Sequence, residues 1–319
     1  MKTVIGGYGD IPFAADLIKG GEIVAFPTET VYGLGASAFC GEAIKKIFAA
    51  KGRPQDNPLI VHIADISMLE QVASEVPAIA YTLFKEFSPG PLTLILKKNP
   101  AISPLVTAGL NTVGVRIPAH RMALELIKAA ELPICAPSAN TSSRVSPTMA
   151  SHVYEDMAGR IPLILDGGSC EVGVESTVLD LTSEPYAILR PGRITAGMLA
   201  PFIKVQSTPA GQGEGVKSPG MKYRHYAPLV KTLLADTPAR AIALRNSYTE
   251  GRAVILGSSR FIEKCGEGIS LGSTSGEIAQ NLYAALRKAE KEYDCLIIEK
   301  LPESEENTAL LNRILKAAD

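Results

Sequence analysis

The sequence predicts an α/β protein built from two units, and three observations support this prediction. The chain has 319 residues, which corresponds to about two domains. Short apolar, strand-like segments alternate with helix-like segments over the first two-thirds of the chain. A stretch rich in Gly, Pro and Ser then interrupts the alternation before it resumes. We therefore expect residues 1–203 to form a larger mixed α/β domain, residues 204–229 a linker and residues 230–319 a smaller α/β domain.

Short apolar segments mark the strands of the larger domain. Residues 22–26 are mostly apolar, contain β-branched side chains and stop at Pro27. Similar segments predict strands at 59–63, 92–96, 113–117, 134–136, 163–166, 177–181 and 187–189. Residues 42–50 have helical spacing and end near Gly52, a suitable C-cap, and residues 119–130 form a second helix. The spacing is too irregular for a repeated βαβ array, so a mixed sheet is expected.

The smaller domain repeats the alternation after the linker. Strands are expected at 230–234, 253–256 and 295–298, and helices at 238–246, 275–289 and 304–317. Strands that alternate with helices pair in parallel, so we expect a small, Rossmann-like parallel sheet. This domain shows no catalytic constellation.

The composition excludes several classes of protein. Lys and Arg number 32 and Asp and Glu 33, so a net charge of -1 argues against a nucleic-acid coat or a membrane-surface protein. Five Cys without a CxxC pair and four His without HExxH predict neither a disulfide framework nor a structural zinc site. No apolar run reaches the roughly 18 residues of a membrane span, and the first residues lack a signal-peptide pattern. We expect a cytoplasmic protein that does not enter the membrane.

A hydroxyl-rich segment, FPTETVYGLG at residues 26–35, is the first candidate for chemistry. It follows a strand and carries Thr28, Glu29, Thr30 and two glycines, which permit unusual backbone angles and close approach of a ligand. It could equally be a tight turn in which the two threonines cap the backbone.

Two cations follow the helix at 42–50. Lys51 and Arg53 flank Gly52, with Asn57 shortly after them. Arg offers forked hydrogen bonds and Lys a point charge, a combination that suits a polyphosphate. A solvated helix C-terminus also favours cations, so the pair by itself does not decide between the two. His62 lies at the end of the next strand, where a His can either be a partly buried structural side chain or contact a ligand.

Isolated polar residues lie in or beside four further predicted strands. Arg116 lies in an apolar strand and needs a partner, either a carboxylate of the protein or a carboxylate of a ligand. The segment 136–143, APSANTSS, is dense in hydroxyls and amides and fits either a phosphate and ribose contact or a polar turn. Ser176 and Arg190 lie beside the strands at 177–181 and 187–189. No Walker-type G-x-x-x-x-G-K-[ST] loop occurs.

Taken together, these segments resemble the YrdC family in its long form, the L-threonylcarbamoyladenylate synthases. The paired K-x-R and S-x-N signature is met by Lys51-Gly52-Arg53 and Ser138-Ala139-Asn140. The FPTETVYGLG, KGRPxxxPL, VGVRIP, APSAN and RPG motifs follow in the family's order over about residues 7–195. The PGMKYRHYAP segment and the α/β region after it are similar to the linker and the additional C-terminal domain of the long form.

The resemblance implies a fold and a reaction. The fold is a twisted mixed sheet with a concave positive face. The reaction converts L-threonine, bicarbonate and ATP to L-threonylcarbamoyl-AMP and pyrophosphate, with Mg²⁺ accompanying the nucleotide. The product would pass to a transferase complex that modifies tRNA. No protein nucleophile is needed, since the reactants supply one and the enzyme orients them and neutralises charge.

The resemblance also assigns site residues. Those for ATP are Lys51, Arg53, Asn57, Thr112, Ser138, Asn140, Ser146, Arg190 and His225. Those for L-threonine are Thr30, His62, Arg116, Ser176 and the backbone at Ala136. Lys51 and Arg53 would stabilise charge, Arg116 would pair with the threonine carboxylate, and His225 would make residues 218–228 a lid over the nucleotide. No protein ligand for the metal is assigned.

Two other functions fit parts of this pattern. Carbamoyltransferases that mature hydrogenases contain a YrdC-type domain, but they add Cys-rich zinc fingers, and this chain has no CxxC pair. A concave positive face could also hold tRNA or double-stranded RNA without chemistry. The near-neutral charge and the complete K-x-R and S-x-N pair disfavour that as the main role, and leave weak RNA binding open as a side activity.

Overall fold

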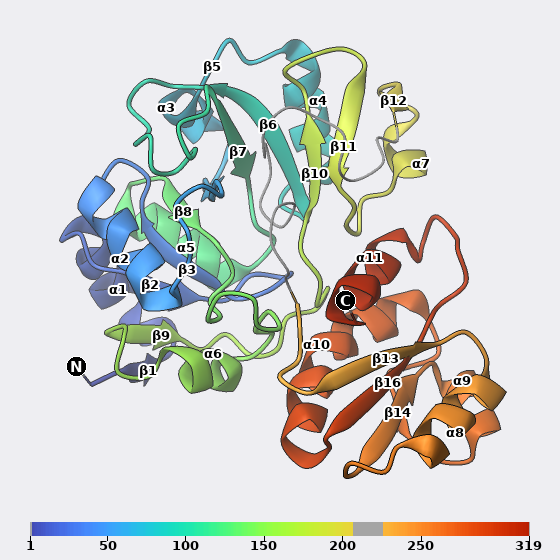
Figure 1. The fold of residues 1–319 in the computed structure, drawn as a ribbon. Helices are drawn as coiled ribbons and strands as arrows, with labels where there is room; N and C mark the ends of the chain where they lie inside the picture. Colours follow the sequence, from blue (N-terminus) through green and yellow to red (C-terminus); the bar gives the residue numbers. More distant parts are fainter. Residues whose placement is uncertain (1, 207–225, 319) are drawn as a thin grey trace.

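The computed structural model describes residues 2–206 and 226–318, which form two β-sheets with their helices (Figure 1). The strands of the first sheet are β1 (Val4–Gly6), β2 (Val24–Phe26), β3 (Gly33–Ser37), β4 (Ile60–His62), β5 (Ala73–Ser74), β6 (Leu92–Lys98), β7 (Thr112–Arg116), β8 (Ile134–Ala136), β9 (Leu163–Leu165), β10 (Thr177–Asp180), β11 (Tyr186–Arg190) and β12 (Val205–Gln206). They follow the order β1-β9-β2-β3-β8-β4-β7-β6-β10-β11-β12, with β5 paired to β6.

This first sheet is mixed, which confirms the prediction. β4 and β7 pair in parallel, whereas β3, β8 and β4 pair antiparallel to one another. The β4–β7 register sets His62 opposite Arg116, so two residues 54 positions apart in the sequence share one end of the sheet. The order of the central strands thus brings the polar strand ends together.

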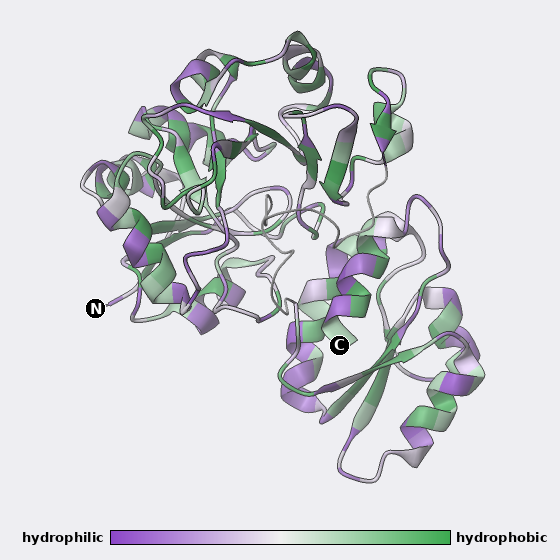
Figure 2. Cartoon of the chain, turned by 45° about the horizontal axis from the view of Figure 1, so that its top comes forward, coloured by the Kyte–Doolittle hydropathy of each residue, from purple (hydrophilic) through white to green (hydrophobic). Residues whose placement is uncertain are grey.

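Helices cover the first sheet. They are α1 (Ile11–Lys19), α2 (Gly41–Lys51), α3 (Leu69–Val72), α4 (Ala78–Phe87), α5 (Arg121–Ala130), α6 (Ala150–Met157) and α7 (Ala196–Leu199), with short 3₁₀ turns η1 (Tyr8–Asp10) and η2 (Ile66–Met68). Gly52 ends α2 in the left-handed conformation at φ 60°, as expected of a C-cap. The strands and the inner helix faces carry the apolar residues, which Figure 2 shows in green.

The segment 26–35 differs from its predicted loop. Residues 27–32 do form a loop, but the two glycines belong to strand β3, outside the left-handed region. A Cβ on Gly35 would lie 2.7 Å from both the Phe26 ring and the Ile134 side chain. These glycines are therefore required by close packing inside the sheet and not by a turn.

The second sheet is parallel throughout, as predicted. Its strands are β13 (Lys231–Ala235), β14 (Ala253–Gly257), β15 (Ile269–Ser270) and β16 (Cys295–Glu299), in the order β13-β16-β14-β15. Helices α8 (Pro238–Ser247), α9 (Ser259–Cys265), α10 (Ser275–Glu292) and α11 (Thr308–Ala318) flank it. A capping box between Thr274 and Glu277 fixes the start of α10.

The two domains share an apolar interface. Val31, Val145 and Val174 of the first domain belong to the same buried cluster as Ile278 and Leu282 of α10. Figure 1 shows α10 and α11 on the side of the second domain that faces the first. The first domain extends to Gln206, because β12 pairs with β11, so the predicted linker begins inside the first sheet. Within the described residues, no helix is long and apolar enough to span a membrane.

Candidate active site

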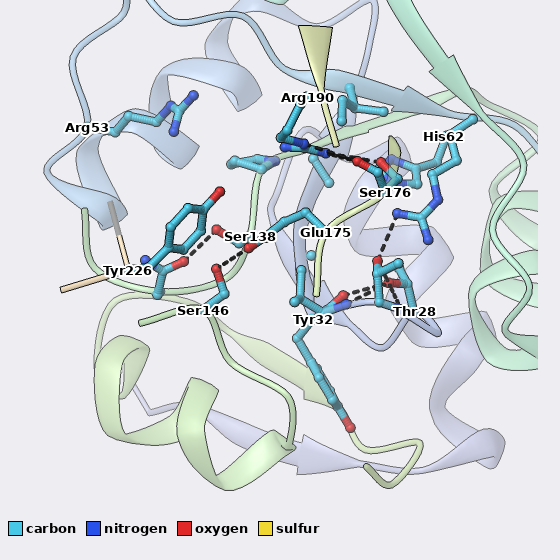
Figure 3. A pocket seen from close by; sticks show the side chains of 18 of the residues that line it. Thr28, Tyr32, Arg53, His62, Ser138, Ser146, Glu175, Ser176, Arg190 and Tyr226 are labelled. Atoms are coloured by element: carbon cyan, nitrogen blue, oxygen red, sulfur yellow. Dashed lines mark hydrogen bonds between the residues drawn. The ribbon is translucent and has the colours of Figure 1, made fainter. Parts of the chain in front are cut away.

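A pocket opens in the first domain where the polar strand ends and loops meet (Figure 3). Predicted residues that line it are Thr30, Arg53, His62, Arg116, Ala136, Ser138, Asn140, Ser146, Ser176 and Arg190. The structure therefore brings together residues from six separate sequence segments. Their roles as ligand contacts stay predictions.

Arg116 is the central cation on one side of the pocket. It ends β7, is only 4% exposed, and donates from Nε to Gly90 O at 3.3 Å and from Nη1 to Thr30 Oγ1 at 2.9 Å. Glu29 Oε1 lies 2.7 Å from Nη2, close enough for an ion pair but outside hydrogen-bond geometry. The sequence left a protein or a ligand carboxylate open as the partner. The structure supplies the first and still leaves Nη2 without a hydrogen-bond acceptor among the described residues.

His62 lies beside Arg116 as a neutral imidazole. Burial, followed by the neighbouring Arg116 charge, lowers its pKa to about 3. Its ring meets the edge of Phe26 at 5.9 Å between centroids, and its Nδ1 has no hydrogen-bond partner in the described structure. An uncharged His in this position can exchange a hydrogen bond with a ligand without adding charge.

Ser176 and Arg190 are hydrogen-bonded neighbours in the lining of the pocket. The Arg190 guanidinium donates to Ser176 O from Nε at 3.1 Å and from Nη2 at 3.0 Å, and to Ser176 Oγ at 3.1 Å. Ser176 Oγ also lies 2.8 Å from Thr93 Oγ1. The buried arginine thus fixes the segment that precedes β10.

The loop after β8 is held from behind by Lys51. The Lys51 Nζ donates to Ser138 O and Asn140 O, each at 2.5 Å. Ser138 Oγ donates to Asn140 Oδ1 at 2.5 Å, and Asn140 Nδ2 donates to Thr141 O and Arg144 O. Burial, followed by repulsion from Arg53, holds the Lys51 pKa well below its ordinary value. Lys51 therefore braces the S-x-N loop and does not line the pocket.

Two other predicted residues, Asn57 and Thr112, also lie elsewhere. Asn57 is 1% exposed and lies beneath Arg53, whose Nη2 donates to Asn57 O at 3.2 Å. Thr112 begins β7, at the opposite end of the strand from Arg116, so the structure does not place it at this pocket. His225 and most of the predicted lid at 218–228 lie outside the described residues.

Sequence reasoning gave several lining residues no role of their own, although one of them, Tyr226, belongs to the predicted lid at 218–228. Arg144 and the aromatic Tyr226 face the pocket, as does Glu175, a buried carboxylate. Burial alone would raise the Glu175 pKa, but Arg313 and Arg190 outweigh it and lower the pKa to about 2. Glu175 directly precedes the predicted residue Ser176, but nothing in the local sequence reveals a partner 138 residues away.

The pocket has two differently equipped sides. In Figure 3, Arg53, Tyr226 and Ser138 lie on one side, and His62, Ser176 and Thr28 on the other. The lining includes four arginines, at positions 53, 116, 144 and 190, and among the described lining residues Glu175 is the one carboxylate. This positive lining agrees with the expected concave positive face and suits an anionic ligand. The described residues contain no group of three or more His, Cys, Asp or Glu arranged to hold a metal ion.

Comparisons with known proteins agree with the fold and the motifs. A Sua5/YciO/YrdC family model, described as "Telomere recombination", matches residues 16–192, and a model described as "Threonylcarbamoyl-AMP synthase, C-terminal domain" matches residues 194–319. The chain is 46% identical to the threonylcarbamoyl-AMP synthase of Pyrococcus abyssi over 97% of this chain and 94% of that protein. It is 47% identical to the Bacillus subtilis synthase over 96% of this chain and 92% of that protein.

A solved structure extends the likeness to three dimensions. The crystal structure of P. abyssi Sua5 complexed with L-threonine matches with a TM-score of 0.92 and 42% identity, over 100% of this chain and 98% of that chain. The resemblance found in the sequence is thereby confirmed. The chain belongs to the Sua5/YciO/YrdC family, in the form that carries the additional threonylcarbamoyl-AMP synthase C-terminal domain.

Proposed function

We propose that this chain is a threonylcarbamoyl-AMP synthase, which joins L-threonine, bicarbonate and ATP and releases pyrophosphate. The observation that carries the proposal is a single pocket lined by four arginines, in which buried Arg116 keeps a donor group without a hydrogen-bond acceptor among the described residues. Full-length relatives at 46–47% identity carry the same activity name.

The Arg116 side of the pocket suits the amino acid. The unsatisfied Nη2 can bind the threonine carboxylate, which would share the guanidinium with Glu29. Thr30 and Ser176 offer hydroxyls, and neutral His62 offers a ring nitrogen for the threonine hydroxyl. The related P. abyssi structure was solved with L-threonine, which supports this choice of substrate.

The opposite side suits the nucleotide. Arg53 and Arg144 supply charge for the phosphates, and Ser138 and Asn140 supply polar groups on a loop that Lys51 holds from behind. The aromatic ring of Tyr226 at this end offers a surface on which a base can stack. We keep the ATP assignment for Arg53, Ser138, Asn140, Ser146 and Arg190, and assign Lys51 and Asn57 a supporting role.

The chemistry needs orientation more than acid–base catalysis. The threonine amine and bicarbonate give a carbamate and water, and a carbamate oxygen then attacks the α-phosphorus of ATP as the bond to pyrophosphate breaks. The arginines neutralise charge that builds up on the phosphates. Two reactants held side by side react without a protein nucleophile, because proximity alone can contribute about 7 kcal/mol or more.

The remaining expectations concern the metal ion, the fate of the product and the binding of RNA. We propose that Mg²⁺ arrives with ATP and, when bound, neutralises phosphate charge; Glu175 is an unsuitable ligand because it already accepts hydrogen bonds from three side chains. A mixed anhydride hydrolyses readily, so a transferase acting on tRNA in the cytoplasm must consume it. Weak binding of tRNA or double-stranded RNA remains compatible with the positive lining.

Pyrophosphate release in the absence of tRNA tests the proposal. The full chain should release pyrophosphate from ATP only when L-threonine and bicarbonate are both present. Arg53→Met should reduce this release at least tenfold, whereas Arg121→Met, which removes a guanidinium that is 79% exposed on α5, should not. Release without threonine, or none at all with every substrate present, would refute the assignment.

A further inference from the structure

A carboxylate in a pocket built for a polyanion needs an explanation. Glu175 lines the pocket proposed to hold ATP, and it is 7% exposed. An ionised carboxylate there would repel a triphosphate and weaken its binding. The inference that follows rests on the proposed use of ATP.

Among the described residues, the C-terminal domain supplies two of the three side chains that hydrogen-bond to this carboxylate. Arg313 of α11 donates from Nε to Glu175 Oε2 at 2.9 Å, and Tyr283 of α10 donates to the same oxygen at 3.1 Å. The third is Ser146, a pocket residue, which donates to Glu175 Oε1 at 2.7 Å. Glu175 therefore connects the second domain directly to the wall of the pocket.

Arg313 also contacts two other residues at this side of the pocket, Pro191 and Tyr226. It is fully buried, and its Nη1 donates at 2.9 Å to the carbonyl of Pro191, the residue after Arg190. Its guanidinium carbon lies 5.5 Å from the centre of the Tyr226 ring. That ring stacks on Tyr283, with 5.7 Å between centroids and 18° between planes. One arginine thus contacts two lining residues, Glu175 and Tyr226, and the residue that follows a third, Arg190.

The backbone around Glu175 is shaped for this contact. Gly173 has a φ of 76°, and a Cβ at this position would lie 2.3 Å from the carbonyl oxygen of Ala279 in α10. Val174 packs in the same apolar cluster as Ile278 and Leu282. The segment 172–176 is therefore fitted against α10, which holds Glu175 in reach of both donors.

We propose that Arg313 is a positioning residue for ATP: it neutralises Glu175, so that this carboxylate orients Ser146 without repelling the phosphates. The C-terminal domain then acts on the reaction from outside the pocket, through one ion pair. Threonine affinity should depend on it much less, because Arg116 has its own partners in the first domain.

The test compares charge removal with charge restoration in the full chain. ATP and L-threonine affinities are measured by calorimetry for the native chain, Arg313→Met, Glu175→Gln and the double variant, and thermal melts report folding. Arg313→Met should weaken ATP binding by roughly tenfold or more and threonine binding by less than about threefold. The double variant should recover most of the ATP affinity, because it removes the uncompensated carboxylate.

The pH dependence adds a result that a purely structural role would not produce. Removing Arg313 raises the pKa of the buried Glu175 carboxyl relative to the native chain, because a lowering charge is lost, while Arg190 and the hydrogen bond from Ser146 still lower it. The ATP defect of Arg313→Met relative to the double variant should therefore shrink as the pH falls from 7 towards 5. Lys291→Met, which removes an exposed ion pair to Glu155 across the same domain boundary, should leave ATP affinity within about twofold of native.

The outcomes distinguish a failure of the proposed function from a failure of the role proposed for Arg313. A native chain that binds no ATP overturns the proposed function. A native chain that binds ATP, with a double variant as weak as Arg313→Met or an Arg313→Met that binds ATP normally, overturns the role of Arg313 alone. If Arg313→Met does not fold, a folded double variant with near-native ATP affinity supports the inference and one with poor affinity overturns it.

Discussion

Replacing Arg116 tests the amino-acid side of the pocket. Arg116→Met keeps the volume of the side chain and removes its donors, but it also leaves Glu29 as a buried carboxylate without its cation. Breaking a buried ion pair from one side costs about 3–5 kcal/mol of stability. The informative variant is therefore Glu29→Gln/Arg116→Met, which removes both charges.

The expected loss of threonine affinity follows from the bonds that Arg116 can make. A carboxylate bound by the guanidinium gains two charge-assisted hydrogen bonds, worth about 1.5–3 kcal/mol each. Their loss, about 3 kcal/mol or more, weakens threonine binding by roughly a hundredfold. Glu29→Gln alone keeps the guanidinium and should retain measurable binding.

Calorimetric titration with L-threonine, alongside a thermal melt, measures this directly. ATP affinity serves as the internal control, because Arg116 pairs in register with His62, and His62 lies on the side of the pocket away from Arg53, Ser138 and Tyr226. A folded double variant that binds threonine within about threefold of the native chain would refute the assignment of Arg116 to the threonine carboxylate.

Three more predictions concern the walls of the pocket. Gly192→Ala places a Cβ 2.6 Å from the Ser176 carbonyl carbon. It should lower the free energy of unfolding by about 1–3 kcal/mol in a denaturant melt and remove most of the threonine affinity. Gly9→Ala, where a Cβ would meet nothing within 4 Å, should change neither quantity. Lys51→Met should lower both the melting temperature and the ATP affinity, since it strands two buried carbonyls; an unchanged melting temperature would mean that Lys51 acts only as a charge. The native chain should lose on the order of 3 kcal/mol of stability relative to Glu175→Gln as the pH falls from about 4.5 to 2, because the pKa of this carboxyl is lowered to about 2 in the folded state; an equal pH dependence of both chains would contradict that value.

The sequence was most informative where a pattern is local. The strand at 134–136 has the same bounds as β8, and Gly52 ends α2 as predicted, because apolar runs and C-caps are read from neighbouring residues. Strand β1 (Val4–Gly6) and helix α1 (Ile11–Lys19) were not predicted. β1 has no buried residue to give it an apolar pattern. The glycines of β3 were predicted to lie in a loop, since their packing against Phe26 and Ile134 is visible only in three dimensions.

The candidate site shows the same division. The motifs at Arg53, His62, Arg116 and Ser138 could be predicted to meet, because each lies at a strand end or beside a helix terminus. The contact between Glu175 and Arg313 could not, since it depends on how two domains dock. Nor could the buried position of Lys51, which the sequence presented as the exposed end of a helix.

The central claim is that one pocket holds ATP and L-threonine together, with proximity in place of a protein nucleophile. A crystal structure of the full chain with L-threonine and an ATP analogue that cannot be cleaved between the α- and β-phosphates tests it most directly. The account predicts the threonine carboxylate on Arg116, the phosphates beside Arg53 and Ser138, and the threonine amine facing the α-phosphorus. Ligands bound on separate faces, or an amine turned away from the α-phosphorus with a protein side chain between them, would contradict it.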